Sequence, residues 1–228
     1  MIPPELQAFF RRLMERAMQP LVRSGITPNM VTVVGLLLSA ATALILAGGH
    51  FIGGGLLVLF SGAFDMLDGG LARARGGGTK FGAFFDSTLD RFSEGIIYLG
   101  LLYWFTVAQR PKSAMLIYLV ILGSLLISYS RARAEGLGLE CKVGLLARPE
   151  RVILLGLALL VDGGRVGSLP DDEILVVVLA GMAILTFFTL AQRIWHIWRL
   201  TLPTPAEAER SALALFLARR EARRARHS

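Results

Sequence analysis

Four aspartates lie within 26 residues of a chain that is otherwise mostly apolar: Asp65, Asp68, Asp86 and Asp90. The first two are three residues apart and the last two are four apart, so in helices each pair would share one face. Between the pairs, the glycine triplet at 76–78 breaks the helical run and predicts a turn. The spacing therefore predicts two helices that bring two pairs of carboxylates face to face.

Facing carboxylates repel one another strongly unless cations lie between them. Carboxylate oxygens are the ligands that Mg²⁺ and related hard cations prefer, and Mn²⁺ is an alternative. Four aspartates can hold two such ions, with Asp65 and Asp86 placed to bridge them. Two divalent ions can clamp a diphosphate, neutralise the charge that builds during transfer and assist the leaving oxygen. The pattern thus predicts a site for two Mg²⁺ ions that can act on a phosphate group.

The composition indicates a membrane protein. Of the 228 residues, 54% are hydrophobic and only 18% are charged, and the mean hydropathy is +0.59. Several apolar stretches approach or exceed the ~20 residues that a helix needs to cross a bilayer. Helices satisfy their own backbone polar groups in lipid, so we predict an all-α polytopic fold. The single cysteine, Cys141, excludes an internal disulfide and a metal site built from several thiolates.

Six apolar segments predict six transmembrane helices. Their expected ranges are 29–48, 51–74, 81–108, 113–134, 149–163 and 173–198. Six spans place both termini on one side of the membrane, and that side then carries all but three of the 24 lysines and arginines. The positive-inside rule makes it the cytoplasmic side. Since the four aspartates also fall on this side, we expect the active site and both termini to face the cytoplasm.

The two ends of the chain are expected to form separate segments around the transmembrane domain at 25–200. Residues 1–24 predict an amphipathic helix, which lies in the cytoplasmic interface or docks on the protein's own spans. Residues 201–228 form a basic tail with five arginines in its last ten residues. This tail fits either a surface helix held to anionic lipid or a solvated end. The net charge of +7 comes with no nucleic-acid-binding signature, so membrane lipid is the expected partner rather than nucleic acid.

The aspartates belong to a longer pattern. It reads Asp65-x2-Asp68-Gly69-x2-Ala72-Arg73-x8-Gly82-x3-Asp86-x3-Asp90. At every position this pattern resembles the signature of the CDP-alcohol phosphotransferase family. The resemblance implies one metal at Asp65, Asp68 and Asp86 and a second metal at Asp65, Asp86 and Asp90. It also implies that Asp90 is the general base that takes the proton of the acceptor hydroxyl.

The resemblance further implies a binding site for a CDP-lipid donor. Its residues would be Asn29, Met30, Val31, Thr32, Gly69, Ala72, Arg73, Thr79 and Gly82. Arg73 can contact the donor diphosphate, and Gly69 lacks a side chain, which would let the nucleotide approach the helix backbone. From residue type alone, Asn29 and Thr32 also fit helix caps or buried polar groups, and both glycines also fit helix packing.

The motif defines the reaction but leaves the acceptor alcohol open. A phosphate-bearing acceptor needs cationic anchors outside the donor motif. The candidates are Arg131, Arg148, Arg151 and Arg193, each of which also fits a simple positive-inside charge. The stretches 130–138 and 148–151 resemble prokaryotic phosphatidylinositol phosphate synthases. Those enzymes have a lysine where Arg131 stands, a difference that keeps the charge and changes its shape.

These resemblances predict transfer of the phosphatidyl group from CDP-diacylglycerol to an inositol phosphate, with release of CMP, by a homodimer in the cell membrane. The nearest alternative is a phosphatidylglycerophosphate synthase, in which glycerol 3-phosphate is the acceptor. A divalent-cation transporter is an alternative of another class, and it would distribute acids across the membrane rather than cluster them. One further acid, Glu94, continues the face of Asp86 and Asp90 by one turn. We expect Glu94 to pair with a basic residue such as Arg91 or Arg131 rather than with metal.

Overall fold

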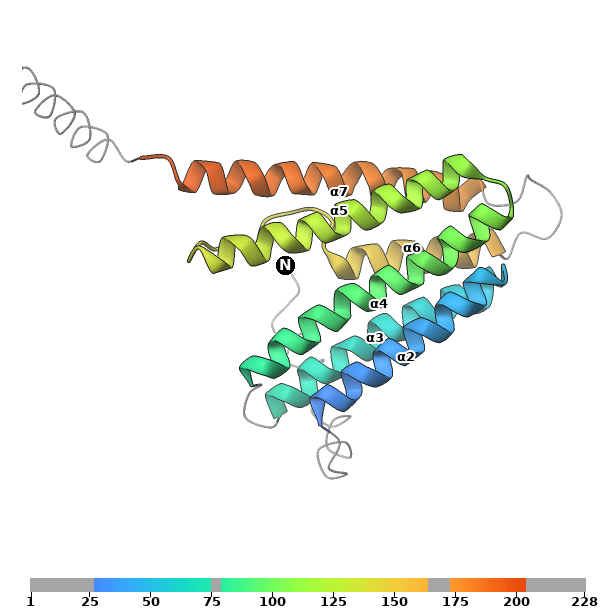
Figure 1. Cartoon of the computed structure of the whole chain (residues 1–228), viewed down its shortest axis with the longest axis horizontal. Coiled ribbons are helices and arrows are strands. Elements are labelled where there is room, and N and C mark those ends of the chain that lie inside the picture. Colours follow the sequence, from blue (N-terminus) through green and yellow to red (C-terminus); the bar gives the residue numbers. More distant parts are fainter. Residues whose placement is uncertain (1–26, 75–78, 164–172, 204–228) are drawn as a thin grey trace, which may run out of the picture.

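The part of the chain that the structure describes is all-helical, as predicted. The computed structural model describes residues 27–74, 79–163 and 173–203, with the side chains of 65–74 and 173 outside the description. Six helices occur in these ranges (Figure 1): α2 (Pro28–Ala47), α3 (Phe51–Ala74), α4 (Lys80–Val107), α5 (Pro111–Gly136), α6 (Arg148–Gly163) and α7 (Glu173–Leu200). Each begins and ends within two residues of a predicted span. The predicted amphipathic helix, and the basic tail from residue 204 onward, lie outside the described residues.

Local sequence determines where α2 and α4 begin. The Thr27 hydroxyl accepts a hydrogen bond from the backbone N–H of Met30 at 3.3 Å, and Pro28 follows in the first turn. The Thr79 hydroxyl accepts one from the N–H of Gly82 at 2.9 Å and caps α4 in the same way. Such side-chain caps satisfy N–H groups that the helix itself leaves free. Thr79 therefore starts the helix that carries Asp86 and Asp90.

The six helices form a closed ring of packed neighbours. In order around the ring, α2 packs on α4, α4 on α5, α5 on α7, α7 on α6, α6 on α3, and α3 on α2. In Figure 1, α5 and α7 form one layer, α2, α3 and α4 form another, and α6 lies between them. The layers diverge toward the end where α4 starts and α5 stops. This open end holds the motif residues.

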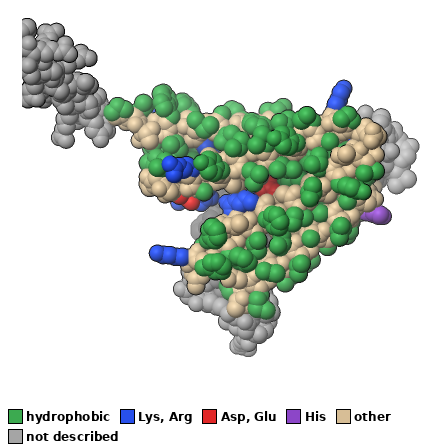
Figure 2. All heavy atoms as spheres, in the orientation of Figure 1, with side chains coloured by type: hydrophobic (Ala, Val, Ile, Leu, Met, Phe, Trp, Pro, Cys, Tyr) green, Lys and Arg blue, Asp and Glu red, His purple; other side chains and the backbone are tan. Residues whose placement is uncertain are grey.

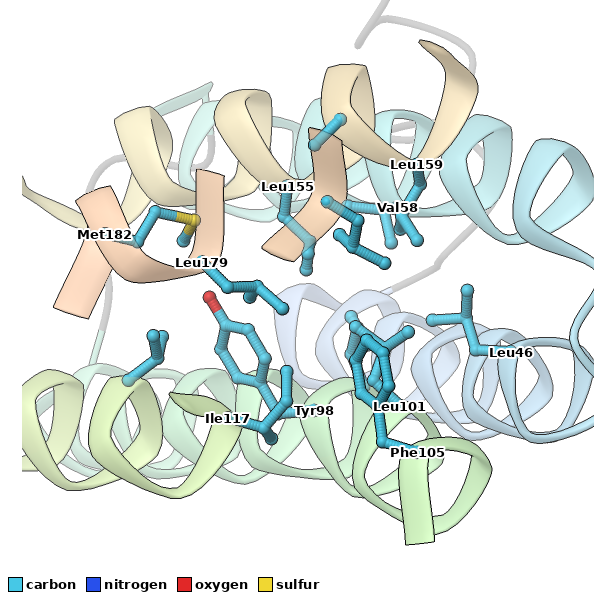
Figure 3. Packing of buried hydrophobic residues seen from close by; sticks show 14 of the residues in the cluster. Leu46, Val58, Tyr98, Leu101, Phe105, Ile117, Leu155, Leu159, Leu179 and Met182 are labelled. Atoms are coloured by element: carbon cyan, nitrogen blue, oxygen red, sulfur yellow. The ribbon is translucent and has the colours of Figure 1, made fainter. Parts of the chain in front are cut away.

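Large apolar side chains fill the middle of the ring. The labelled residues in Figure 3 come from all six helices, and among them Leu46, Leu101 and Phe105 have no exposed surface. Small residues let the helices approach closely, as is common in membrane bundles. A Cβ on Gly100 would lie 2.3 Å from the carbonyl oxygen of Ala43, so α2 and α4 touch backbone to backbone there. The core thus joins every helix that carries a candidate site residue.

The outer surface of the bundle is largely apolar. Hydrophobic side chains are spread over the whole described face seen in Figure 2, and many large ones are exposed. Among the described residues, three helices are long and apolar enough to cross a bilayer: α2, α5 and α7 from Ile174 onward. The described side chains of α3 form a shorter apolar segment, Phe51–Phe64. The first half of α4 carries charged residues, and α6 has only 16 residues. The helices are therefore those of a membrane protein.

Candidate active site

Asp86 and Asp90 lie one turn apart on α4, and both are partly buried. The Oδ1 atom of Asp90 lies 2.9 Å from Nη1 of Arg148, the first residue of α6. The two side chains in this ion pair are 22% and 25% exposed, respectively, so a ligand can reach them. In Figure 2, basic and acidic side chains gather in the notch where the two helical layers diverge. The structure therefore brings one predicted phosphate anchor into contact with the predicted base.

The carboxylates of α3 complete the predicted metal site. Asp65 and Asp68 lie in the last three turns of α3, together with Gly69, Ala72 and Arg73, and the side chains of all five are outside the description. Among the side chains that are described, no group of three or more His, Cys, Asp or Glu is placed to hold a metal. Asp86 and Asp90 provide oxygen donors one turn apart, which fits a hard divalent cation. The joint geometry of the four acids stays a prediction.

Three predicted donor-site residues from distant parts of the chain meet where α2 and α4 begin. A Cβ on Gly82 would lie 3.1 Å from Oγ1 of Thr79 and 3.4 Å from Oδ1 of Asn29. The missing side chain of Gly82 therefore preserves a small space between two polar groups. Of the other residues in this turn, Met30 is exposed and Val31 is buried.

Thr32 fits the alternative that residue type alone had suggested. Its side chain is buried, and its hydroxyl donates to the carbonyl of Pro28 at 3.1 Å. Thr32 thus makes a bond within its own helix as a satisfied interior polar group. The cap of α2 is Thr27, not Asn29.

Arg151 forms the most completely bonded polar contact in the described part of the chain. Its Nε and Nη2 atoms donate to the two oxygens of Glu94 at 2.7 and 2.9 Å. Nη2 also donates to Oγ of Ser124 at 2.8 Å, and Nη1 donates to the carbonyl of Leu146 at 3.2 Å. The side chain is 1% exposed. Four of the five N–H groups of an arginine are thus engaged, and this guanidinium is not open to an added phosphate.

The sequence correctly predicted that Glu94 pairs with a basic residue, but the partners it suggested were wrong. Glu94 does pair with a basic residue, but neither Arg91 nor Arg131 is that residue. Arg91 donates to the carbonyl of Ser87 on its own helix, and Arg131 pairs with Glu135 at 2.8 Å on the exposed side of α5. The true partner is 57 residues away. Spacing along one helix carries no signal for such a contact, nor for the roles of Ser124 and Leu146.

Arg193 on α7 is also buried, but its partners are neutral. Its Nε donates to the carbonyl of Val143 at 3.0 Å, and its Nη1 donates to the carbonyl of Ile127. Among the described residues, no carboxylate lies within salt-bridge distance of Arg193. Burying a cation without an opposite charge is costly. Within the described part of the chain, no salt bridge offsets the cost of burying Arg193.

An apolar crevice of about 460 Å³ opens beside the ion pair of Asp90 and Arg148. It lies between α3 and α6 and is lined by Leu59, Gly62, Ala63, Arg148, Pro149, Val152 and Ile153. Among the described residues of this lining, Arg148 is the one that carries a charge. The crevice therefore joins an apolar space to the polar notch.

Comparisons with known proteins identify a family model and similar chains. The family model described as CDP-alcohol phosphatidyltransferase matches residues 25–188. The chain is 37% identical over 212 residues to the phosphatidylinositol phosphate synthase of Mycobacterium tuberculosis, covering 91% of this chain and 94% of that protein. It is 36% identical over 192 residues to the archaetidylinositol phosphate synthase of Methanothermobacter thermautotrophicus, covering 83% of this chain and 93% of that protein.

Two crystal structures of the Mycobacterium tuberculosis enzyme are similar to the fold described above. The structure with CDP-DAG bound has a TM-score of 0.75 and 36% identity, covering 82% of this chain and 94% of that one. The complex with manganese and citrate has a TM-score of 0.74 and 37% identity, covering 81% and 88%. With the family signature, the helical ring and these similarities in place, the chain belongs to the CDP-alcohol phosphatidyltransferase family.

Proposed function

We propose that this chain is a phosphatidylinositol phosphate synthase, which transfers the phosphatidyl group of CDP-diacylglycerol to a hydroxyl of an inositol phosphate. The observation that carries the proposal is the contact between Asp90 and Arg148 at 2.9 Å. It places a cation that can bind a phosphate beside the last carboxylate of the family motif. The names of the two relatives, a phosphatidylinositol phosphate synthase and an archaetidylinositol phosphate synthase, support the same acceptor.

In the proposed reaction, the acceptor oxygen forms a bond to the lipid-side phosphorus of the donor. The bond from that phosphorus to the bridging oxygen breaks, and CMP leaves with the electron pair. Asp90 takes the proton of the acceptor hydroxyl. Asp65, Asp68, Asp86 and Asp90 would hold two divalent ions, Mg²⁺ or Mn²⁺, which when bound supply charge neutralisation at the diphosphate. A relative crystallised with manganese supports the choice of metal.

The donor would lie across the starts of α2 and α4 and the end of α3. Asn29, Thr79 and Gly82 line the place where α2 and α4 meet, and the family resemblance adds Gly69, Ala72 and Arg73 on α3. The lipid part can use the apolar crevice of about 460 Å³ between α3 and α6, where Arg148 is the one charged residue among those described. This arrangement keeps acyl chains in an apolar space while the diphosphate meets the polar notch.

Three arginines are proposed as anchors for the phosphate of the acceptor. Arg148 is 25% exposed and already lies beside Asp90. Arg131 is 48% exposed at the end of α5. Arg193 is buried among neutral carbonyls and uses two of its five N–H groups in the described contacts. Arg151 is excluded from this set because Glu94, Ser124 and Leu146 occupy its donors.

We further propose that residues 25–200 cross the cell membrane six times as one domain, with the catalytic end in the cytoplasm. The six helices share one core, and three of them meet the length and hydropathy of a membrane span by themselves. The distribution of lysines and arginines supports the orientation. The amphipathic segment at 1–24, the basic tail at 201–228 and a homodimeric state complete this proposal.

The test is CMP release by the purified protein in lipid-containing micelles, with CDP-diacylglycerol and a panel of acceptors. The panel contains an inositol phosphate, glycerol 3-phosphate, inositol and serine, and Asp90→Asn is the inactive control. We expect the inositol phosphate to give the fastest release. Preference for glycerol 3-phosphate would support the phosphatidylglycerophosphate synthase alternative, since that acceptor also carries a phosphate. Cation flux in proteoliposomes without CMP release would support a transporter.

A further inference from the structure

Two acid–arginine pairs connect α4 to α6 at successive turns. Asp90 and Glu94 are four residues apart on α4, and Arg148 and Arg151 are three residues apart on α6. Asp90 pairs with Arg148 at 2.9 Å, and Glu94 pairs with Arg151 at 2.7 Å. Asp90 and Arg148, the outer pair, are each about one-quarter exposed. Glu94 and Arg151, the inner pair, are 8% and 1% exposed.

The two helices joined by these pairs lie on opposite sides of the ring. The close neighbours of α4 are α2 and α5, and those of α6 are α3 and α7. Packing of neighbouring backbones therefore does not by itself set the distance between Asp90 and the start of α6. Long side chains that reach across the interior can set that distance. The inner pair of Glu94 and Arg151 is such a connection.

Arg151 is held from several directions at once. Glu94 comes from α4, Ser124 from α5, and the carbonyl of Leu146 from the segment that precedes α6. The backbone N–H of Leu146 in turn donates to Oγ1 of Thr189 on α7 at 3.2 Å. A buried bidentate pair resists disruption, because removal of one partner leaves an uncompensated buried charge. Asp90 and Arg148 are partly exposed to solvent, which weakens the electrostatic attraction between them. This attraction alone therefore holds the two side chains together only weakly.

We propose that Glu94 is a positioning residue, which acts through Arg151 to hold the first turn of α6 so that Arg148 meets Asp90. The helical turn between Arg148 and Arg151 is rigid, so fixing one residue fixes the other. This inference rests on the proposed function, because that function makes Arg148 a phosphate anchor beside the base. It gives a role to an acid that lies outside the family motif.

A double-mutant cycle separates positioning from simple stabilisation. The variants are Glu94→Gln, Arg148→Gln and both together, and the readout is kcat/KM for the inositol phosphate at saturating CDP-diacylglycerol. Misplacement by about 1 Å can cost on the order of 100-fold in rate, so we expect Glu94→Gln alone to lose about 10- to 100-fold. In the Arg148→Gln background, the same change should cost less than about 3-fold, because coupled residues are not additive. Equal losses in both backgrounds would overturn the inference.

Two further variants distinguish a loss of positioning from a general loss of folding. Ser124→Ala removes one contact of Arg151 and keeps the ion pair, so it replaces Glu94→Gln if that variant does not fold. Ser124→Ala should lower kcat/KM less than Glu94→Gln does, and this loss should also disappear in the Arg148→Gln background. Ile117→Val, in the fully buried core of α5, is the matched control for a general loss of stability. It should lower the melting temperature and leave the effect of Arg148→Gln unchanged.

A second measurement does not depend on activity. The coupling of Asp90 with Arg148 is measured from melting temperatures of Asp90→Asn, Arg148→Gln and the double variant, in EDTA. We expect a coupling in the wild-type background, a weaker one in the Ser124→Ala background and none in the Glu94→Gln background. An equal coupling in all backgrounds would overturn the positioning role. If the wild type releases no CMP with an inositol phosphate, the proposed function fails, and this measurement still decides the role of Glu94.

Discussion

The Nε atom of Arg193 lies 3.0 Å from the carbonyl oxygen of Val143, 50 residues earlier in the chain. This bond joins the end of α7 to the segment between α5 and α6, and a second bond to Ile127 joins it to α5. Two N–H groups of Arg193 therefore have a structural role, because they bind the carbonyls of Val143 and Ile127. We propose that its remaining N–H groups bind the ligand. Substitutions can separate the two.

Arg193→Lys should weaken acceptor binding more than donor binding. Lysine keeps the positive charge but cannot donate to two carbonyls and a phosphate in the planar arrangement of a guanidinium. We expect KM for the inositol phosphate to rise about 10-fold or more, in line with the loss of a charge-assisted hydrogen bond. KM for CDP-diacylglycerol should stay within about 2-fold of the wild-type value. The substitution keeps the positive charge, and salt screens the effect of a charge on groups that it does not contact. Steady-state kinetics with each substrate varied in turn provide the measurement, and a matching rise in both KM values would contradict the assignment.

Gly82→Ala should impair donor binding. The added Cβ would lie 3.1 Å from Oγ1 of Thr79 and 3.4 Å from Oδ1 of Asn29, which is tight enough to push these polar groups apart. We expect KM for CDP-diacylglycerol to rise, with a small loss of stability of about 1 kcal/mol from a weakened cap. Gly95→Ala on the same helix is the control, because no atom lies within 4 Å of its Cβ. Unchanged donor KM in Gly82→Ala would remove Gly82 from the donor site.

CMP release should depend on a divalent metal ion, and substitution of Asp86 or Asp90 on α4 should change that dependence. EDTA should abolish CMP release, and Mg²⁺ or Mn²⁺ should restore it, because carboxylate oxygens bind hard divalent ions. Asp86→Asn should raise the metal concentration needed for half-maximal activity. Asp90→Asn should also lose at least about 100-fold in kcat at saturating metal, as expected when a general base is removed. Full activity of Asp90→Asn at saturating metal would exclude it as the base.

The helices were predictable from the sequence, whereas contacts across the ring were not. The bounds of α3 agree with the prediction at both ends, because a glycine–histidine break precedes Phe51 and the glycine triplet follows Ala74. Such signals are local. The pairing of Glu94 with Arg151 depends on which helices lie opposite each other in the ring, and the spacing within α4 contains no information about that.

The same limit applies to Gly144. Its φ of +138° is in the range that favours glycine, but glycine at this place in the sequence also fits an ordinary loop. Only the fold shows that the residue lies against α7, where a Cβ would meet Cγ2 of Thr189 at 2.6 Å. The segment between α5 and α6 therefore owes its path to tertiary contacts rather than to local turn signals.

Gly144→Ala should accordingly disturb the acceptor side of the site. The clash with Thr189 and the unfavourable φ both act on the segment that Arg193 and Arg151 hold through Val143 and Leu146. Gly138→Ala is the matched control, because Gly138 also has a positive φ, of 75°, but no atom lies near its Cβ. We expect both variants to lose about 1 kcal/mol from backbone strain and only Gly144→Ala to raise KM for the acceptor. Equal kinetics in the two variants would contradict a role for this segment.

Gly100→Ala should destabilise the protein far more than Gly95→Ala, although both lie on α4. A Cβ at Gly100 would lie 2.3 Å from the oxygen and 2.7 Å from the Cα of Ala43, so α2 and α4 would have to separate. Overpacking of this kind costs about 1–3 kcal/mol, and rigid backbone atoms place it at the upper end. The cost of Gly95→Ala should be near zero or favourable, because alanine has the better helix propensity. Thermal unfolding in detergent compares the two variants. Equal melting temperatures would mean that the close approach of α2 and α4 does not hold the bundle together.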